Sequence, residues 1–473
     1  MKRLKTKLFL KIEIIEILDN EQDFLSMQQL AHDLGDITLN NVRLTCLELK
    51  EDFEKIYPNN EVELVINTRY GIKLIHQGID LQRLVENFFV DDLSYKIYQA
   101  LFLNKEVITD DFCEQHYISK STLARYLQRL NNLLSQRQLR IFLSDKMTLS
   151  GPVSKICSNY QYYFFLVHRR LDRLTWFPEI EKYVQLTKQV FAYLDIEPTD
   201  DNQQFLGLFV LIISQNSKRY GGVTLEEPTM RYHSSYHFNT KRPDFLPEWT
   251  EIDWDFFLLT LYATNFIPND NVLQTIKPYI FEEDIALCLT TFEKYFRPLT
   301  EDETDTLAAS LDRHILFHTM FLVNNFLLSM FGLTNFNSFN EDFPFYQQQF
   351  TQFWEELETK SNQFNGSDYL RFKLFLICTS LVDPKAFNPT VKLFVHSDIA
   401  HTHRSFMEKR ISYFLLRYNV LFVENVNQSD VIISTFQNTD LGHSPVIHVY
   451  PSLSNKDLKN IEDFLNETFM HKK

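Results

Sequence analysis

Basic side chains are spaced along one short stretch of the sequence in a way that suits binding to the phosphates of a nucleic acid. Residues 115–144 contain no Asp or Glu but hold Lys120, Arg125, Arg129 and Arg137. The whole chain has 62 acidic and 47 basic residues, so an acid-free window stands out. Lysine and arginine bind nucleic acids by displacing the cations that surround phosphate groups. An ordinary solvated helix face is the alternative interpretation of these charges.

The elements around this window predict a winged helix-turn-helix. Thr109 predicts the cap of a helix over 109–117, and residues 118–122 predict a turn that caps a second helix. That helix is amphipathic, with apolar residues at helical spacing: Leu123, Tyr126, Leu127, Leu130 and Leu134. A hairpin, 139–143 and 147–150, follows as the wing. The candidate DNA contacts are Lys120, Ser121, Thr122, Arg125, Arg129 and, in the hairpin turn, Lys146.

A similar pattern occurs once before in the chain. A helix within 24–35 ends at Gly35, Thr38 predicts the cap of a second helix, and strands 62–66 and 72–75 flank a turn. The candidate DNA contacts here are Asn40, Asn41, Arg43 and, at the tip of the turn, Arg69. Acidic residues crowd the later turns of the second helix, so a structural module without DNA contacts is the alternative.

Length and composition predict a regulator of several domains. A chain of 473 residues suggests about three domains or more. Residues 1–155 have a net charge of −2, out of −15 for the whole chain. The remaining residues therefore have a net charge of −13 and would repel a nucleic acid, which leaves the amino-terminal modules as the place for it to bind. The five cysteines stand singly in the sequence, without the paired spacing of a zinc site. The longest apolar run, 205–213, is too short to span a membrane. We expect a soluble, cytoplasmic protein with reduced thiols.

The rest of the chain predicts helices followed by an α/β region. Residues 155–388 form two helical blocks separated by an extended loop over 216–247. In the second block, Thr300 and Glu303 predict a capping box before a helix that carries His314. After residue 390, strands 391–395, 420–423, 431–434 and 446–450 alternate with helices 405–418 and 455–469, a pattern typical of a parallel sheet.

This order of elements resembles the Mga/AtxA-type transcriptional regulators of Gram-positive bacteria over essentially the whole chain. The resemblance implies a mainly α, multidomain fold. Its domains are expected to be winged helix-turn-helix 1 over 1–78, winged helix-turn-helix 2 over 79–156, phosphotransferase-system regulation domains over 157–278 and 279–388, and an enzyme IIB-like α/β domain over 389–473.

The resemblance also implies sites of histidine phosphorylation. The segment 299–315 is similar to the family helix that carries a phosphorylatable histidine, which makes His314 the first candidate. Lys373 and Phe209 stand where other histidines are expected, and His168 is the nearest alternative acceptor. A structural histidine, or a metal pair with His318 four residues later, are the alternatives for His314; we expect no metal.

In the carboxy-terminal domain, Ser397 stands about where an enzyme IIB has its phosphoacceptor cysteine. A carrier function is therefore not expected, and the resemblance implies a role in subunit contact, with His396 or His403 as further possible phosphoryl acceptors.

We therefore expect a DNA-binding transcriptional regulator, of the global or virulence-activator type, rather than an enzyme. Histidine phosphorylation from the sugar phosphotransferase system would modulate its activity or oligomerisation. The implied partners are double-stranded DNA, a second copy of the chain through the carboxy-terminal domain, and phosphocarrier proteins; no cofactor and no membrane are expected. The alternatives are an RNA-binding antiterminator, which would begin with a β-rich domain, and a phosphoryl carrier of the phosphotransferase system.

Overall fold

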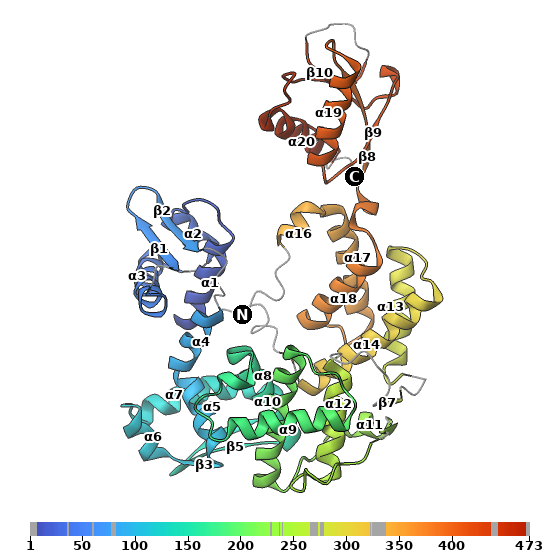
Figure 1. The fold of residues 1–473 in the computed structure, drawn as a ribbon. Helices are drawn as coiled ribbons and strands as arrows, with labels where there is room; N and C mark the ends of the chain where they lie inside the picture. The colour runs from blue at the N-terminus through green and yellow to red at the C-terminus, as the bar shows by residue number, and fades with distance from the viewer. Residues whose placement is uncertain are drawn as a thin grey trace. The chain divides into compact units, whose positions relative to one another are not determined.

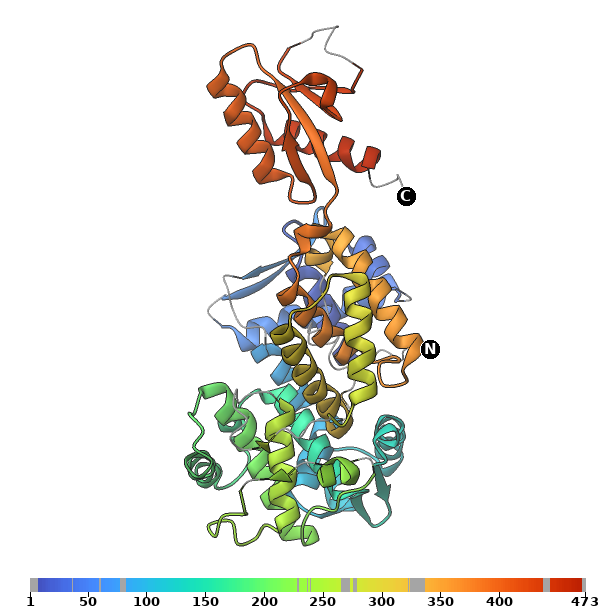
Figure 2. The same cartoon turned by 90° about the vertical axis from the view of Figure 1, so that its right-hand side faces the viewer.

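The protein is described here by a computed structural model covering residues 7–35, 37–58, 61–76, 82–227, 229–235, 237–238, 240–264, 273–274, 279–321, 323, 337–436 and 443–469. The chain forms two compact units, Met1–Glu282 with Ala309–Leu333, and Glu283–Ala308 with Thr334–Lys473 (Figures 1 and 2).

The two helices and the hairpin predicted for the first module are present, and a further helix precedes them. It contains α1 (Lys7–Asp19), α2 (Met27–Asp33), α3 (Leu39–Ile56) and the antiparallel hairpin β1 (Val62–Asn67) and β2 (Gly71–His76). The Thr38 hydroxyl caps α3 by accepting a hydrogen bond from the Asn41 amide. Gly71 has φ +106°, and a Cβ there would lie 2.1 Å from the Leu25 carbonyl oxygen. Only glycine therefore lets the hairpin pair with the segment before α2.

The second winged module is also confirmed, with one additional strand. It contains α4 (Gln82–Asp91), α5 (Leu93–Leu103), β3 (Glu106–Ile108), α6 (Thr109–Gln115), α7 (Lys120–Leu134), the 3₁₀ turn η1 (Ser135–Arg137), β4 (Arg140–Leu143) and β5 (Lys146–Ser150). The strand order is β3-β5-β4, and both pairings are antiparallel. Strand β3 has no signal in the sequence, because three residues are too few to show an alternating pattern.

The prediction that Thr109 caps the first helix of this module was wrong. The cap position is Ile108, which makes no capping hydrogen bond from its side chain. Thr109 is the first helical residue, and its hydroxyl donates to the Ser144 carbonyl at 2.7 Å. The threonine therefore joins α6 to the hairpin turn of the wing.

Helices form the rest of the first unit. They are α8 (Val153–His168), α9 (Ile180–Tyr193), α10 (Asp200–Tyr220), α11 (Thr229–Ser235) and α12 (Glu251–Thr264), with the short elements η2 (Leu171–Arg173), β6 (His237–Phe238) and β7 (Leu273–Gln274). Both α8 and α10 are buried on nearly all sides, so they form the centre of this unit. The predicted extended loop over 216–247 is corrected, because α10 continues to Tyr220 and α11 lies within it.

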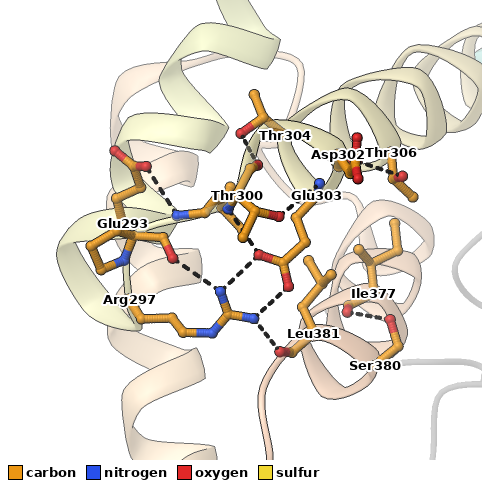
Figure 3. A network of polar contacts seen from close by, with 12 residues as sticks. Glu293, Arg297, Thr300, Asp302, Glu303, Thr304, Thr306, Ile377, Ser380 and Leu381 are labelled. Atoms are coloured by element: carbon orange, nitrogen blue, oxygen red, sulfur yellow. Dashed lines mark hydrogen bonds and ion pairs between the residues drawn. The ribbon is translucent and has the colours of Figure 1, made fainter.

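The second unit begins with α13 (Glu282–Tyr295) and the first turns of α14 (Glu301–Phe321) and continues with α16 (Asn337–Asp342), α17 (Pro344–Lys360), α18 (Asp368–Leu381) and η3 (Pro384–Phe387). The predicted capping box is confirmed. The Glu303 amide donates to Thr300 Oγ1 at 3.3 Å, and the Thr300 amide donates to Glu303 Oε2 at 3.0 Å (Figure 3). Arg297 holds both Glu303 carboxylate oxygens and also donates to the Leu381 carbonyl, so it ties the start of α14 to the end of α18. These bonds, above all that from Arg297, lower the pKa of Glu303 to about 2.

The carboxy-terminal strands form a parallel sheet, as predicted. The elements are β8 (Thr390–His396), α19 (His401–Phe414), β9 (Asn419–Phe422), η4 (Val426–Gln428), β10 (Val431–Ser434), β11 (Val446–His448) and α20 (Asn455–Phe469). The strand order is β11-β10-β8-β9, with every pairing parallel. Alternate residues of β8 pack in one core with α19 and α20, so both helices cover the same face of the sheet.

No helix in the described part of the chain is long and apolar enough to cross a membrane. All five cysteines are buried free thiols. Among the described residues, no three His, Cys, Asp or Glu side chains come together in a way that could hold a metal ion.

Candidate nucleic-acid interface

Helix α7 presents most of the predicted DNA contacts on one exposed face. The Ser119 hydroxyl caps it by accepting from the Thr122 amide at 3.1 Å. Leu123, Leu127 and Leu130 are buried against the module, and this fixes which face is left to solvent. Exposed or half-buried on the other face are Lys120, Ser121, Thr122, Arg125 and Arg129. The helix therefore offers cations and hydroxyls from its first three turns, as a recognition helix does.

The cations of this interface fall into two groups. Lys120 is paired with Asp110 at 2.6 Å and Lys146 with Glu106 at 2.5 Å, and all four side chains are exposed. The hydrogen bond that each lysine donates to its carboxylate raises the pKa of that lysine. Arg125 and Arg129 form no ion pair with any residue that the structure describes. The two arginines are thus available to phosphate without first losing a carboxylate partner.

Arg137 is removed from the predicted basic face. The chain leaves helical geometry at η1, and Gln138 takes a left-handed conformation with φ +59°. Arg137 is buried, donates to Asn159 Oδ1 at 3.0 Å and lies 5.2 Å from the ring centre of Tyr162. It therefore anchors the module to α8 and cannot contact DNA.

Sequence reasoning missed three residues that shape this surface. Asn131 of α7 bonds both the amide and the carbonyl of Ile141, which fixes the wing against the helix. Arg140 is exposed on the edge strand β4 and lies over the Phe142 ring at 5.2 Å, so it adds a cation to the wing. Tyr117, in the turn before α7, is 97% exposed with φ 53°.

The first module presents a weaker version of the same surface. Asn40, Asn41 and Arg43 are exposed on the first turns of α3, as predicted. Arg69 is exposed at the hairpin tip, where Asn67 Oδ1 accepts from the Arg69 and Tyr70 amides and shapes the turn. The surface is small, and Leu44 and Leu47 are exposed on the same helix.

The two histidine candidates lie in different environments. His168, at the end of α8, is 2% exposed, and its Nδ1 is 2.7 Å from Glu86 Oε1 while its Nε2 is 2.6 Å from the Tyr95 hydroxyl. Both ring nitrogens are thus occupied inside the protein, which favours a structural role. His314, on α14, is half-buried. Burial lowers the pKa of His318, one turn later, to about 4.

The two residues that stand in place of expected histidines, Phe209 and Lys373, are both packed beside aromatic rings. Phe209 is fully buried, with its ring 5.5 Å from that of Phe256 and 5.9 Å from that of Phe321. A histidine there would have to be buried among aromatic rings. Burial lowers the pKa of Lys373, which lies over the rings of Tyr369 and Phe372.

Two carboxylates, those of Asp110 and Glu106, lie on this surface beside its lysines. Asp110 and Glu106 compete with phosphate for Lys120 and Lys146, and exposed ion pairs are weak. We expect Asp110→Asn with Glu106→Gln to tighten duplex DNA binding by about two- to fivefold at low salt. Fluorescence anisotropy titration would measure this. The charge-matched control is Glu181→Gln with Asp463→Asn, since both residues lie outside the winged modules. If the control tightens DNA binding equally, the effect comes from net charge alone.

Comparison with known proteins agrees with this geometry. Residues 77–164 match the family model of the Mga helix-turn-helix domain, a range that runs through the second winged module and into α8. The match is consistent with a Mga/AtxA-type regulator, and it confirms the resemblance inferred from the sequence. A search of curated proteins found no match to the chain.

Proposed function

We propose that this protein is a DNA-binding transcriptional regulator that contacts duplex DNA through α7 and the wing of its second module. The observation that carries the proposal is a pair of exposed arginines, Arg125 and Arg129, that form no ion pair with any described residue and lie on a capped helix beside a basic hairpin. An α-helix fits the major groove of DNA, and a hairpin beside it can rest on the neighbouring backbone. The match to a Mga-type helix-turn-helix domain supports the same function.

A gel-shift titration against duplex DNA and single-stranded RNA, at two salt concentrations, tests this proposal. We expect duplex binding that weakens steeply with salt, because phosphate contacts release bound cations. Preferential binding to RNA would favour an antiterminator instead. Absence of binding to either nucleic acid, by a protein that is folded by circular dichroism, would contradict the proposal.

The proposed regulation acts through the helical region between the winged modules and the parallel sheet. We place regulation domains at 157–278 and 279–388, and an enzyme IIB-like domain at 389–473 that joins two copies of the chain. Large apolar side chains are exposed on that last domain, among them Phe406, Tyr413, Leu421 and Tyr450, and this supports a subunit contact. Sedimentation velocity of the full-length protein tests the dimer.

His314 is the proposed acceptor of a phosphoryl group from a phosphocarrier protein. Its sequence neighbours are held in the core, since Asp312 accepts from the Tyr262 hydroxyl at 2.9 Å and Arg313 lies 4.9 Å from the Tyr262 ring centre. A phosphoryl group would add about two negative charges to this half-buried helix face. Unless a cation pairs with the phosphoryl group, the burial of this charge favours a rearrangement of the helix and its neighbours.

Labelling by a purified, phosphorylated phosphocarrier protein tests this assignment. We expect wild type to take up an acid-labile label that His314→Ala loses. His318→Ala is the matched control, because it removes an imidazole from the same helix one turn later, and it should keep the label. Equal labelling of wild type and His314→Ala would place the acceptor elsewhere.

A further inference from the structure

Helix α3 of the first winged module corresponds to α7 of the second residue by residue. Each helix follows a capping hydroxyl, that of Thr38 for α3 and that of Ser119 for α7. Counted from these caps, the buried apolar residues stand at the same positions: Val42, Cys46, Leu49 and Phe53 in α3, and Leu123, Leu127, Leu130 and Leu134 in α7. The exposed faces of the two helices can therefore be compared position by position.

The positions that carry cations on α7 carry other side chains on α3. Where α7 has Lys120, Arg125 and Arg129, α3 has Leu39, Leu44 and Glu48. Leu44 is 51% exposed, and Leu47, three residues later on the same face, is 44% exposed. The middle of α3 thus offers solvent an apolar patch. Phosphate gains nothing from such a patch, whereas another protein surface can bury it.

The charges beside these leucines have opposite signs at the two ends of the patch. Arg43 lies one turn before Leu47, and Glu51 lies one turn after it. Both charged side chains are exposed, and neither forms an ion pair with a residue that the structure describes. They are about 12 Å apart along the helix axis, too far to pair with each other in one chain. Read from either end, the row has a charge, a leucine and the opposite charge.

A second copy of α3 that runs in the opposite direction fits this row. Two-fold symmetry places residues at equal distances from Leu47 opposite one another. Arg43 of each copy then meets Glu51 of the other, and the two Leu47 side chains meet at the axis. Leu44 lies against the aliphatic stem of Lys50 of the other copy, whose ammonium group stays in water. Charges that are unmatched within one chain are therefore matched between two chains.

The same pairing is excluded for α7 by its charges. That helix has three cations, Lys120, Arg125 and Arg129, and no acidic residue, so two copies of it would repel each other. The two modules thus differ in the partner that their second helices suit. Helix α7 suits a polyanion, and α3 suits a surface that carries both signs around an apolar centre.

We propose that α3 pairs in antiparallel fashion with α3 of a second copy of this chain, about a two-fold axis at Leu47. The stripe over 40–54 is about 21 Å long, so one helix pair buries less area than an independent stable interface needs. The pairing therefore rests on the dimer proposed through the carboxy-terminal domain, which keeps the two helices at a high effective concentration. It also takes Arg43 away from DNA, so the pairing and a DNA contact by this arginine exclude each other.

Disulfide cross-linking of the full-length protein tests the pairing. In Leu47→Cys the two new thiols face each other at the axis, and mild oxidation should join the two chains. The matched control is Gln128→Cys, which has the same position on α7 and is also exposed. The five natural cysteines are buried and are present in both variants. We expect Leu47→Cys to cross-link at least about 10-fold faster than Gln128→Cys, because only α3 is held against its copy.

Charge exchange separates specific pairing from chance collision. In the Leu47→Cys protein, Arg43→Glu sets two carboxylates against each other, and Glu51→Arg sets two guanidinium groups against each other. Each change should slow cross-linking by about 10-fold, because like charges meet at the interface. Both changes together restore the ion pairs in reversed order and should restore the rate. Lys188→Glu on α9 changes net charge as Arg43→Glu does and should leave the rate unchanged.

Two results would overturn the proposal. One is an equal rate of cross-linking for Leu47→Cys and Gln128→Cys, and the other is a double charge exchange that stays as slow as either single one. Circular dichroism, sedimentation velocity and duplex binding are measured on the same samples. A folded dimer that binds DNA but does not cross-link through residue 47 would contradict the α3 pairing alone. A monomer would contradict the proposed dimer as well.

Discussion

Replacing Arg125 and Arg129 together by alanine is expected to weaken binding to duplex DNA by about 10- to 100-fold at low salt. Both side chains are exposed on α7 and form no ion pair with a described residue, so their loss removes two cations that can meet phosphate directly. Each phosphate contact contributes about −0.9 to the slope of log affinity against log salt. The slope should therefore become shallower by about 1.8.

Titrations by fluorescence anisotropy at four or more salt concentrations would measure both quantities. The control is Lys188→Ala with Arg371→Ala, which removes the same charge from exposed positions on α9 and α18. Exposed substitutions of this kind change stability little, so the variants should unfold as wild type does. Wild-type affinity and slope in the α7 variant would remove this helix from the interface.

Local signals in the sequence predicted where several helices begin. Ser119 and Thr38 do cap the second helices of their modules, and Thr300 and Glu303 form the predicted capping box. Each of these depends on residues within four positions of one another. Where the stabilising groups are close in sequence, the pattern alone decides the structure.

The errors arose where the decisive partner is distant in sequence. Arg137 has helical spacing with Arg129, yet the chain turns at η1 and buries it against Asn159, 22 residues later. Thr109 has the residue type of a helix cap, but its hydroxyl donates a hydrogen bond to the Ser144 carbonyl, 35 residues away. Neither contact has a local signal, because each depends on how the wing and α8 pack.

The environment of His168 could not have been predicted for the same reason. Its partners Glu86 and Tyr95 lie 82 and 73 residues earlier, on α4 and α5. From sequence, this histidine was a candidate phosphoacceptor because it stands in a helix of the first regulation block. The geometry instead gives it a network that joins the helices before the wing to α8.

That network leads to the second prediction, that Glu86→Ala destabilises the first unit by about 2–3 kcal/mol. The carboxylate accepts from His168 Nδ1 at 2.7 Å and from Arg173 Nη1 at 2.9 Å. His168 is almost fully buried, so removal of Glu86 leaves the N–H group at Nδ1 buried without its partner. The folded state then loses the full desolvation free energy of that group. Arg173 is more exposed and can return to water, so Arg173→Ala should destabilise by less than about 1 kcal/mol.

The same contact makes stability depend on pH. Burial by itself would raise the pKa of Glu86, but the bonds from His168 and Arg173 outweigh it and lower the pKa below 4.5. A lowered pKa in the folded state stabilises the protein above the ordinary value of the carboxyl group, and this contribution is lost as the pH falls through the folded value. The free energy of unfolding of wild type should therefore exceed that of Glu86→Gln near neutral pH, and the difference should disappear as the pH falls below about 4.5.

Hydrogen exchange of α4, α5 and α8, with urea unfolding midpoints across pH, would measure the effect where it arises. A local measurement is preferable because a chain with two compact units is not expected to unfold in one step. Protection should fall in those three helices in Glu86→Ala, while α19 and α20 keep theirs and serve as the internal control. Unchanged exchange in α8 would mean that His168 is held by packing alone and that its two ring nitrogens are not committed to a structural role.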